Sequence, residues 1–191
     1  MRQGPQKALT GSALDSRVAQ FGQRSMIRSI QRGVLSVPNG SSTAAATITS
    51  VDPNNSVLSV SQDGDGAVNR WDASVGTVVF TNATTITATR TTTTGDVLRT
   101  SYEVIEYWPG VIKSVQRGTI TLAGAASNTA TITTVNTSKS MLFDLRYSTT
   151  ELAVPHTITT RLTLTNATTV TASRAVGTGT NISSYQIVEF Y

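Results

Sequence analysis

The sequence contains no cysteine and only one histidine, His156, and these two shortages exclude several kinds of reactive site. Without cysteine there is no disulfide bond, no thiolate nucleophile and no cysteine-based zinc site. A catalytic triad would depend on His156, which follows a proline and has no glycine-framed nucleophile motif beside it. We therefore expect His156 to lie in an exposed loop, and we predict no catalytic residue, no cofactor and no metal site.

Aromatic residues make up only 6% of the chain and charged residues 14%. No apolar run approaches about 18 residues, the length that spans a membrane as a helix. The N-terminal residues also lack the apolar stretch of a secretory signal. We therefore expect no membrane partner and no export by the secretory route. Scarce aromatic residues argue against a sugar-stacking platform, for which Trp71 and Trp108 are the candidates.

Threonine, by contrast, occurs 34 times. Threonine, valine and isoleucine lose side-chain freedom in helices and pack well on the pleated surface of a sheet. Apolar and polar residues alternate over residues 86–90 and 170–174, with the period of a half-buried strand. Turn-forming pairs such as Asn39-Gly40 separate these short segments. The sequence therefore predicts an all-β fold of antiparallel sandwich or barrel-like units.

Most of the chain is a tandem repeat. The segment IRSIQRGVLSV matches IKSVQRGTITL, and three more pairs of segments match in the same order: ATITSVDPNNSVL with ATITTVNTSKSML, TNATTITATR with TNATTVTASR, and SYEVIEY with SYQIVEF. Each unit is about eighty residues long, too long for a solenoid repeat and similar in size to a small β-domain. The predicted organisation is an extended N-terminal arm at 1–26, repeat 1 at 27–107, a linker at 108–111 and repeat 2 at 112–191. Residues 59–78 and 143–160 match least, and we expect variable loops and middle strands there.

Positive charge is concentrated in the arm and the first strand of repeat 1. Residues 1–32 contain six basic residues and one acidic residue, whereas the remainder is close to neutral. Such an arm can bind phosphate groups or an acidic protein surface. Its single aromatic residue, Phe21, gives little support for base stacking, so a protein partner is favoured over nucleic acid. Leu14, Val18 and Phe21 fall at helical spacing, which predicts a short helix within residues 8–28. The predicted partner-binding residues are Arg2, Lys7, Arg17, Arg24, Arg28, Arg32 and Arg117.

Four charged residues recur at equivalent places in the repeats. Arg90 matches Arg174, and Glu106 matches Glu189. Because all four follow apolar alternations, we predict that each arginine pairs with the glutamate of its own repeat at a sheet rim. The acidic run at 63–66 does not meet the spacing of a calcium-binding EF-hand loop, so we interpret it as a polar turn.

The motif Gln-Arg-Gly is the sharpest polar signature, at 31–33 and again at 116–118. The glycine is expected to allow a β-bulge or a close approach of another chain segment. The arginine is expected to bind a neighbouring carboxylate or to take part in a subunit interface.

Threonine-rich β-repeats, the Gln-Arg-Gly strand starts, strands such as TNATTVTA and the endings SYEVIEY and SYQIVEF resemble structural proteins of tailed-bacteriophage virions. The resemblance covers residues 27–191. It implies a non-enzymatic capsid decoration (cement) protein in the virion that binds the major capsid protein or another virion protein. It also implies a homo-oligomer, a trimer or a dimer, attached through the arm. A phage tail or fibre component is the alternative within this class, and a carbohydrate-binding module is the alternative from another class.

Overall fold

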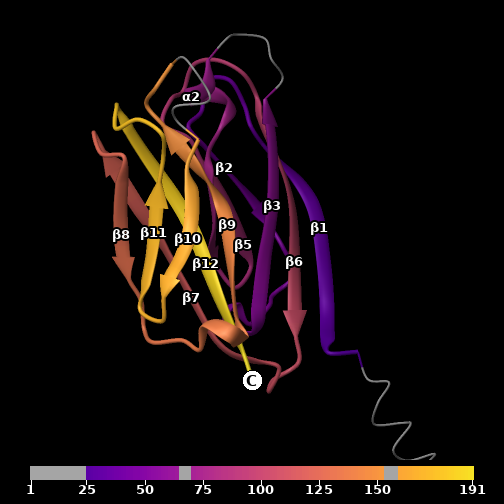
Figure 1. Cartoon of the computed structure of the whole chain (residues 1–191). Helices are drawn as coiled ribbons and strands as arrows, with labels where there is room; N and C mark the ends of the chain where they lie inside the picture. Colours follow the sequence, from indigo (N-terminus) through magenta and orange to yellow (C-terminus); the bar gives the residue numbers. More distant parts are fainter. Residues whose placement is uncertain (1–24, 65–69, 153–158) are drawn as a thin grey trace, which may run out of the picture.

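The computed structural model describes residues 25–64, 70–152 and 159–191, and these residues form an all-β protein, as predicted (Figure 1). The strands of repeat 1 are β1 (Ile27–Val37), β2 (Thr43–Thr47), β3 (Ser56–Gly64), β4 (Thr77–Asn82), β5 (Thr85–Thr89) and β6 (Leu98–Tyr107). Those of repeat 2 are β7 (Ile112–Ala123), β8 (Ser127–Thr131), β9 (Ser140–Thr149), β10 (Arg161–Asn166), β11 (Thr169–Ser173) and β12 (Thr180–Phe190). Short helical turns are η1 (Pro53–Asn55), α2 (Trp71–Ser74) and η2 (Thr137–Lys139).

The two repeats have the same sheet topology. In repeat 1, a long antiparallel sheet in the order β1-β6-β3 packs on a short one in the order β2-β5-β4. In repeat 2, the corresponding orders are β7-β12-β9 and β8-β11-β10. In the residues that the structure describes, each unit is therefore a sandwich of six strands with its own apolar core, and residues of both sheets contribute to that core.

Side-chain alternation creates the core of repeat 1. Along β6, Leu98, Tyr102 and Val104 point inward and are buried, whereas Arg99 and Ser101 point outward and are exposed. Short turns connect the strands. In the turn after β4, the Asn82 side-chain oxygen accepts a hydrogen bond of 2.8 Å from the backbone N–H of Thr84, which replaces a backbone turn contact.

Strand β12 departs from this alternation. Every residue of the segment 183–189 is buried, so both faces of the strand are covered, whereas its counterpart β6 is covered on one face only. The inner face packs on the core of repeat 2. The outer face packs against repeat 1, where Val188 joins Val57 and Ile112 in a third apolar cluster.

Strand β9 completes the core of repeat 1, although it belongs to repeat 2. Leu145 is 1% exposed and lies in the core of repeat 1, and Phe143 packs beside it. The register of β9 against β12 shifts at this place, and Arg146 adopts a φ of 71°, a left-handed conformation typical of a β-bulge. The bulge redirects the strand so that Leu145 reaches the neighbouring sandwich.

The structure refines several expectations. The divergent stretches 59–78 and 143–160 include the second halves of β3 and β9, and α2 follows in the first of them. Residues 27–28, at the end of the predicted helix, belong to β1. His156, Asp65 and residues 8–24 lie outside the described residues. Among the residues that are described, no helix has the length and apolarity needed to cross a membrane.

Truncating Leu145 tests whether the two sandwiches depend on each other. We expect Leu145→Ala to lower the free energy of unfolding by about 2–5 kcal/mol, the usual cost of a cavity in a packed core. Urea unfolding of the full chain measures this change. Leu152→Ala is the matched control, because Leu152 is 52% exposed and its loss should change stability by less than about 0.5 kcal/mol. Equal effects of the two substitutions would contradict a structural role for Leu145.

Candidate partner-binding surface

The chain enters repeat 1 beside an open apolar hollow. Ser25, Met26, Trp108 and Pro109 line this hollow, whose volume is about 630 Å³. Met26 is 65% exposed and Trp108 is 50% exposed, and exposed apolar side chains that adjoin one another mark a candidate interaction site. We call this surface the arm root, because residues 1–24 precede it directly.

Backbone hydrogen bonds join the arm root to the linker and to the C-terminus. The N–H of Trp108 donates to the Met26 carbonyl over 3.0 Å, and the N–H of Val111 donates to the Trp108 carbonyl over 3.3 Å. The N–H of Tyr191 then donates to the Val111 carbonyl over 3.4 Å. The start of β1, the linker and the end of β12 therefore meet at the bottom of the molecule in Figure 1. Tyr191, which is 69% exposed, extends the aromatic surface there.

Arg28 places a guanidinium group at the arm root, where it is paired with a carboxylate. Its guanidinium lies 5.5 Å from the ring centroid of Trp108, within the range of a cation–π interaction. Its Nη1 also donates to Glu106 Oε1 over 3.1 Å, while the Arg28 side chain stays 52% exposed. The arm root thus combines an exposed indole, an exposed thioether and an accessible cation.

A buried carboxylate anchors this end of each sandwich. Glu106 accepts hydrogen bonds from Arg28, from the Ser29 hydroxyl and from the backbone N–H of Asp52. In repeat 2, Glu189 accepts from Lys113 over 2.8 Å, from the Ser114 hydroxyl over 3.2 Å and from the N–H of Asn136 over 3.0 Å. The hydrogen bonds from Lys113 and Asn136 hold the pKa of the Glu189 carboxyl below its usual range.

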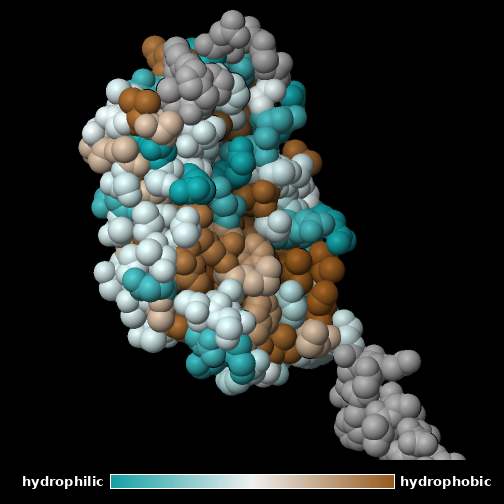
Figure 2. All heavy atoms as spheres, in the orientation of Figure 1, coloured by the Kyte–Doolittle hydropathy of each residue, from teal (hydrophilic) through white to brown (hydrophobic). Residues whose placement is uncertain are grey.

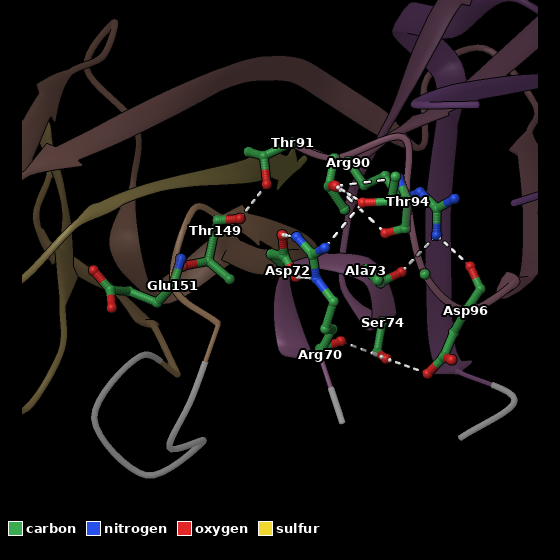
Figure 3. Close-up of polar contacts among 12 residues, drawn as sticks. Arg70, Asp72, Ala73, Ser74, Arg90, Thr91, Thr94, Asp96, Thr149 and Glu151 are labelled. Atoms are coloured by element: carbon green, nitrogen blue, oxygen red, sulfur yellow. Dashed lines mark hydrogen bonds and ion pairs between the residues drawn. The ribbon is translucent and has the colours of Figure 1, made fainter. Parts of the chain in front are cut away.

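The predicted pairing of Arg90 with Glu106, and of Arg174 with Glu189, is wrong. Arg90 is buried and donates instead to the carbonyl oxygens of Ala73 and Asp96 (Figure 3). It also donates to the carbonyl oxygens of Pro38 and Ser41. Arg174 donates to the carbonyls of Leu122, Ala125 and Gly179 and to the Asn181 side-chain oxygen. The two arginines fasten loops at the end of the sandwich opposite to the glutamates, because each follows a strand that runs away from the glutamate end.

The glutamine of each Gln-Arg-Gly motif acts as a substitute peptide group. The Gln31 amide donates to the Thr49 carbonyl over 2.9 Å and accepts from the Thr49 N–H over 2.7 Å. Gln116 makes the same two bonds with Thr133, over 2.9 and 2.7 Å. Both bonds tie the first strand of a repeat to the segment that follows its second strand.

A tyrosine ring makes the close approach that was expected at the glycine of each motif, and the ring leaves no room for a larger residue there. A Cβ atom on Gly33 would lie 2.5 Å from the Tyr102 hydroxyl oxygen, and one on Gly118 would lie 2.6 Å from that of Tyr185. The tyrosine rings therefore pack directly on the glycine backbones from the neighbouring strand.

The arginines of the two motifs have different environments. Arg32 lies on the outer face of β1, 62% exposed, and its Nε donates to Glu103 over 2.5 Å. Arg117 donates from Nε to Gln186 over 2.9 Å and from Nη2 to the carbonyls of Pro53 and Ser56, both over 2.8 Å. Burial lowers the pKa of Arg117 to about 10, which leaves it protonated at neutral pH.

Of the three predicted partner-binding residues that the structure describes, Arg28 alone lies at the arm root. Arg32 faces solvent further along β1, and Arg117 binds repeat 1 of its own chain. The other four, Arg2, Lys7, Arg17 and Arg24, lie outside the described residues. Met26 and Tyr191 were missed by sequence reasoning, since nothing in their local pattern marks exposed apolar side chains.

Possible metal ligands and comparisons with known proteins were the remaining sources of a functional assignment. Within residues 25–64, 70–152 and 159–191, no group of three or more histidine and acidic side chains is arranged to hold a metal ion. Comparisons with protein-family models, curated proteins and solved structures found no match.

The carboxylate of Glu189 makes stability depend on pH. Because its folded pKa is lowered, its contribution is present above the unfolded pKa of about 4.3 and is lost as the pH falls through the folded value. We expect Glu189→Gln to destabilise the protein by about 1–3 kcal/mol at pH 7, since Lys113 loses a charged acceptor. This difference should shrink progressively below pH 4.

Melting temperatures of both proteins between pH 2 and pH 8 test this expectation. Glu103→Gln is the control, because Glu103 forms an exposed ion pair with Arg32 and such pairs contribute less than about 1 kcal/mol. A constant difference between wild type and Glu189→Gln over the whole pH range would contradict the role given to the carboxylate.

Proposed function

We propose that this chain is a non-enzymatic structural protein of a virion, a capsid decoration protein that attaches through its arm and arm root. The observation that carries the proposal is the position of the arm root: exposed Met26 and Trp108, with Arg28 beside them, lie where the basic N-terminal residues enter the sandwich. An attachment segment and a fixed contact surface therefore adjoin one another.

The chemistry of the arm root indicates the kind of partner. An exposed tryptophan and a nearby arginine are the residue types that dominate binding energy at protein interfaces. The six basic residues of 1–32 favour an acidic surface, and complementary charge accelerates association. The proposed partner is therefore an acidic surface with an apolar depression, on the major capsid protein or on another virion protein.

The body of the protein suits a mechanical role. Two sandwiches share an apolar cluster and are joined further by Arg117, so force applied to one is transmitted to the other. The polar side chains that recur in both repeats, described above, form hydrogen bonds with strands or loops of the chain itself. A tail component would use the same surface, and the resemblance of the sequence extends to that alternative.

The carbohydrate-binding alternative finds less support. Trp71 belongs to α2 at the top of the molecule in Figure 1, whereas Trp108 lies at the bottom, so the two do not form one stacking platform. Within the described residues, the exposed aromatic side chains at the arm root adjoin a basic arm, which fits a protein surface better than a sugar.

Imaging a C-terminal tag on purified particles tests the location. Regular labelling of the shell is expected for a decoration protein, and labelling confined to the tail would replace that proposal with the tail alternative. Absence of the tag from every particle would contradict a virion role altogether.

Removal of residues 1–24 tests the arm. We expect the truncated protein to keep its melting temperature, because the described sandwich begins after these residues, and to lose binding to assembled shells measured by co-sedimentation. Undiminished binding of the truncated protein would contradict attachment through the arm.

Trp108→Ala tests the arm root separately. We expect at least a tenfold weaker binding to shells with little change in melting temperature, as for an interface residue that contributes more than about 1.4 kcal/mol. Trp71→Ala is the matched control, because Trp71 is also exposed, at 38%, but lies at the other end. Equal effects of the two substitutions would exclude the arm root as the contact surface.

A further inference from the structure

The two repeats contact each other through two different surfaces. Repeat 2 contributes the outer face of its long sheet, which we call the sheet face, with Arg117 and Gln186 at its centre. Repeat 1 contributes a different surface, the sandwich edge formed by η1, β3 and β4. There the Pro53 and Ser56 carbonyls accept from Arg117, and the Arg117 guanidinium lies 4.7 Å from the ring centroid of Phe80.

Because the repeats have the same fold, each carries both surfaces, and one of each is left unused in a single chain. On the sheet face of repeat 1, Ser101 is exposed and the Glu103 side chain is 45% exposed, whereas their counterparts Ser184 and Gln186 are 0% exposed. Repeat 2 covers the lower end of this face, where Val57, Ile105 and Tyr107 pack in the third apolar cluster. In the described chain, the rest of the sheet face of repeat 1, around Ser101 and Glu103, is uncovered.

The sandwich edge of repeat 2 is free in the same way. Met141 is 53% exposed, whereas its counterpart Val57 is 2% exposed beneath repeat 2. Ser140 is half-buried, whereas Ser56 is fully buried. Leu142 and Leu164 are only partly buried against the core of repeat 2. Figure 2 shows apolar side chains gathered in the lower middle of the molecule, where β9 and β10 lie in Figure 1.

The free sheet face has the polar arrangement of the occupied one. Arg32 Nε donates to Glu103 just as Arg117 Nε donates to Gln186, over 2.5 and 2.9 Å. Because Nε of Arg117 is bonded in this way, its Nη2 is available to donate to two carbonyl oxygens, one in η1 and one at the start of β3. The equivalent carbonyls in repeat 2 belong to Thr137, which is exposed, and Ser140. The charges also match, since Glu103 replaces Gln186 on the sheet face and Lys139 replaces Asn55 on the edge.

We propose that two copies of this chain bind each other through these surfaces. The sheet face of repeat 1 in one copy packs on the sandwich edge of repeat 2 in the other copy. The contact between chains repeats the contact within the chain. It is shallower, because Ser59 and Ser61 stand where repeat 2 has Phe143 and Leu145, and these serines line an open hollow of about 300 Å³. The contact between chains is therefore a reversible subunit interface rather than a fused core.

The geometry keeps the shift along the axis of the contact small, as a closed ring requires. A heterologous contact, repeated, closes into a ring when its rotation divides a full turn with no shift along the axis, and otherwise gives a filament. Tyr107 and Phe190 are equivalent residues, and their ring centroids are only 6.1 Å apart. Repeat 2 is related to repeat 1 by a rotation about an axis and a shift along that axis. The shift cannot be longer than the distance between two equivalent points, so it is small compared with a strand of ten residues, which is about 33 Å long.

The mass of the full chain in solution, measured by light scattering during size-exclusion chromatography, tests this proposal without any virion. We expect a discrete oligomer, and we expect Arg32→Glu on the sheet face and Met141→Asp on the edge each to reduce it to the 20.2 kDa monomer. Val176→Asp is the control, because Val176 is 42% exposed but lies on neither surface, between β11 and β12. Unchanged circular dichroism spectra and cooperative melting establish that the variants are folded, since loss of the oligomer can itself lower the melting temperature.

Mixing the two monomeric variants gives the sharper result. Met141→Asp keeps an intact sheet face and Arg32→Glu keeps an intact edge, so the mixture should form a one-to-one dimer and nothing larger. A wild-type chain that stays monomeric at every concentration would overturn the proposal. So would an oligomer that resists both substitutions, one that Val176→Asp also dissociates, or a mixture that stays monomeric. Loss of the oligomer would leave attachment through the arm root unaffected, which separates this proposal from the proposed function.

Discussion

Burial of strand β12 on both of its faces is the constraint on which the rest of this structure depends. A strand covered twice must satisfy its polar side chains without water, and Gln186 does so in part by accepting from Arg117 and from the N–H of Leu58. Its Nε2 and the hydroxyls of Ser183 and Ser184 have no hydrogen-bond partner in the described part of the chain. Such groups cost free energy, so the apolar contacts around them must outweigh that cost.

The sequence predicts the parts of the fold that rest on repeated local patterns. Segments that match in the same order indicate two units with one topology. The glycines of the Gln-Arg-Gly motifs indicate that another group packs closely on the strand, and in the structure this group is a tyrosine ring. The pairing of Arg90 with Glu106 failed for a definite reason. Arg90 lies near the start of β6 and Glu106 near its end, so a strand length separates them, and the alternation of side chains does not tell which end of a sheet a residue occupies.

Two further features could not be predicted from the sequence, for another reason: the contact between the two repeats, and the arm root. Either sheet face could have been the covered one, since both begin from the same motif. The differences between the repeats contained the clue. Phe143 and Leu145 replace serines in a divergent stretch, and Gln186 replaces a glutamate in a matched segment, but a difference between repeats does not by itself distinguish a loop from an interface. Met26 and Trp108 likewise come together through a tertiary contact that no local pattern predicts.

The contact between two different surfaces of the repeats also suggests how the chain arose. In an ancestor with a single repeat, the same sheet face and edge would have met between separate molecules, at the cost of their translational freedom. A linker of four residues, 108–111, turns that meeting into an intramolecular event with a high effective concentration. Once association was assured, substitutions such as Phe143 and Leu145 could deepen one copy of the contact while the other stayed polar. In the assembly proposed above, duplication would have converted a set of identical contacts into one in which permanent contacts within a chain alternate with reversible contacts between chains.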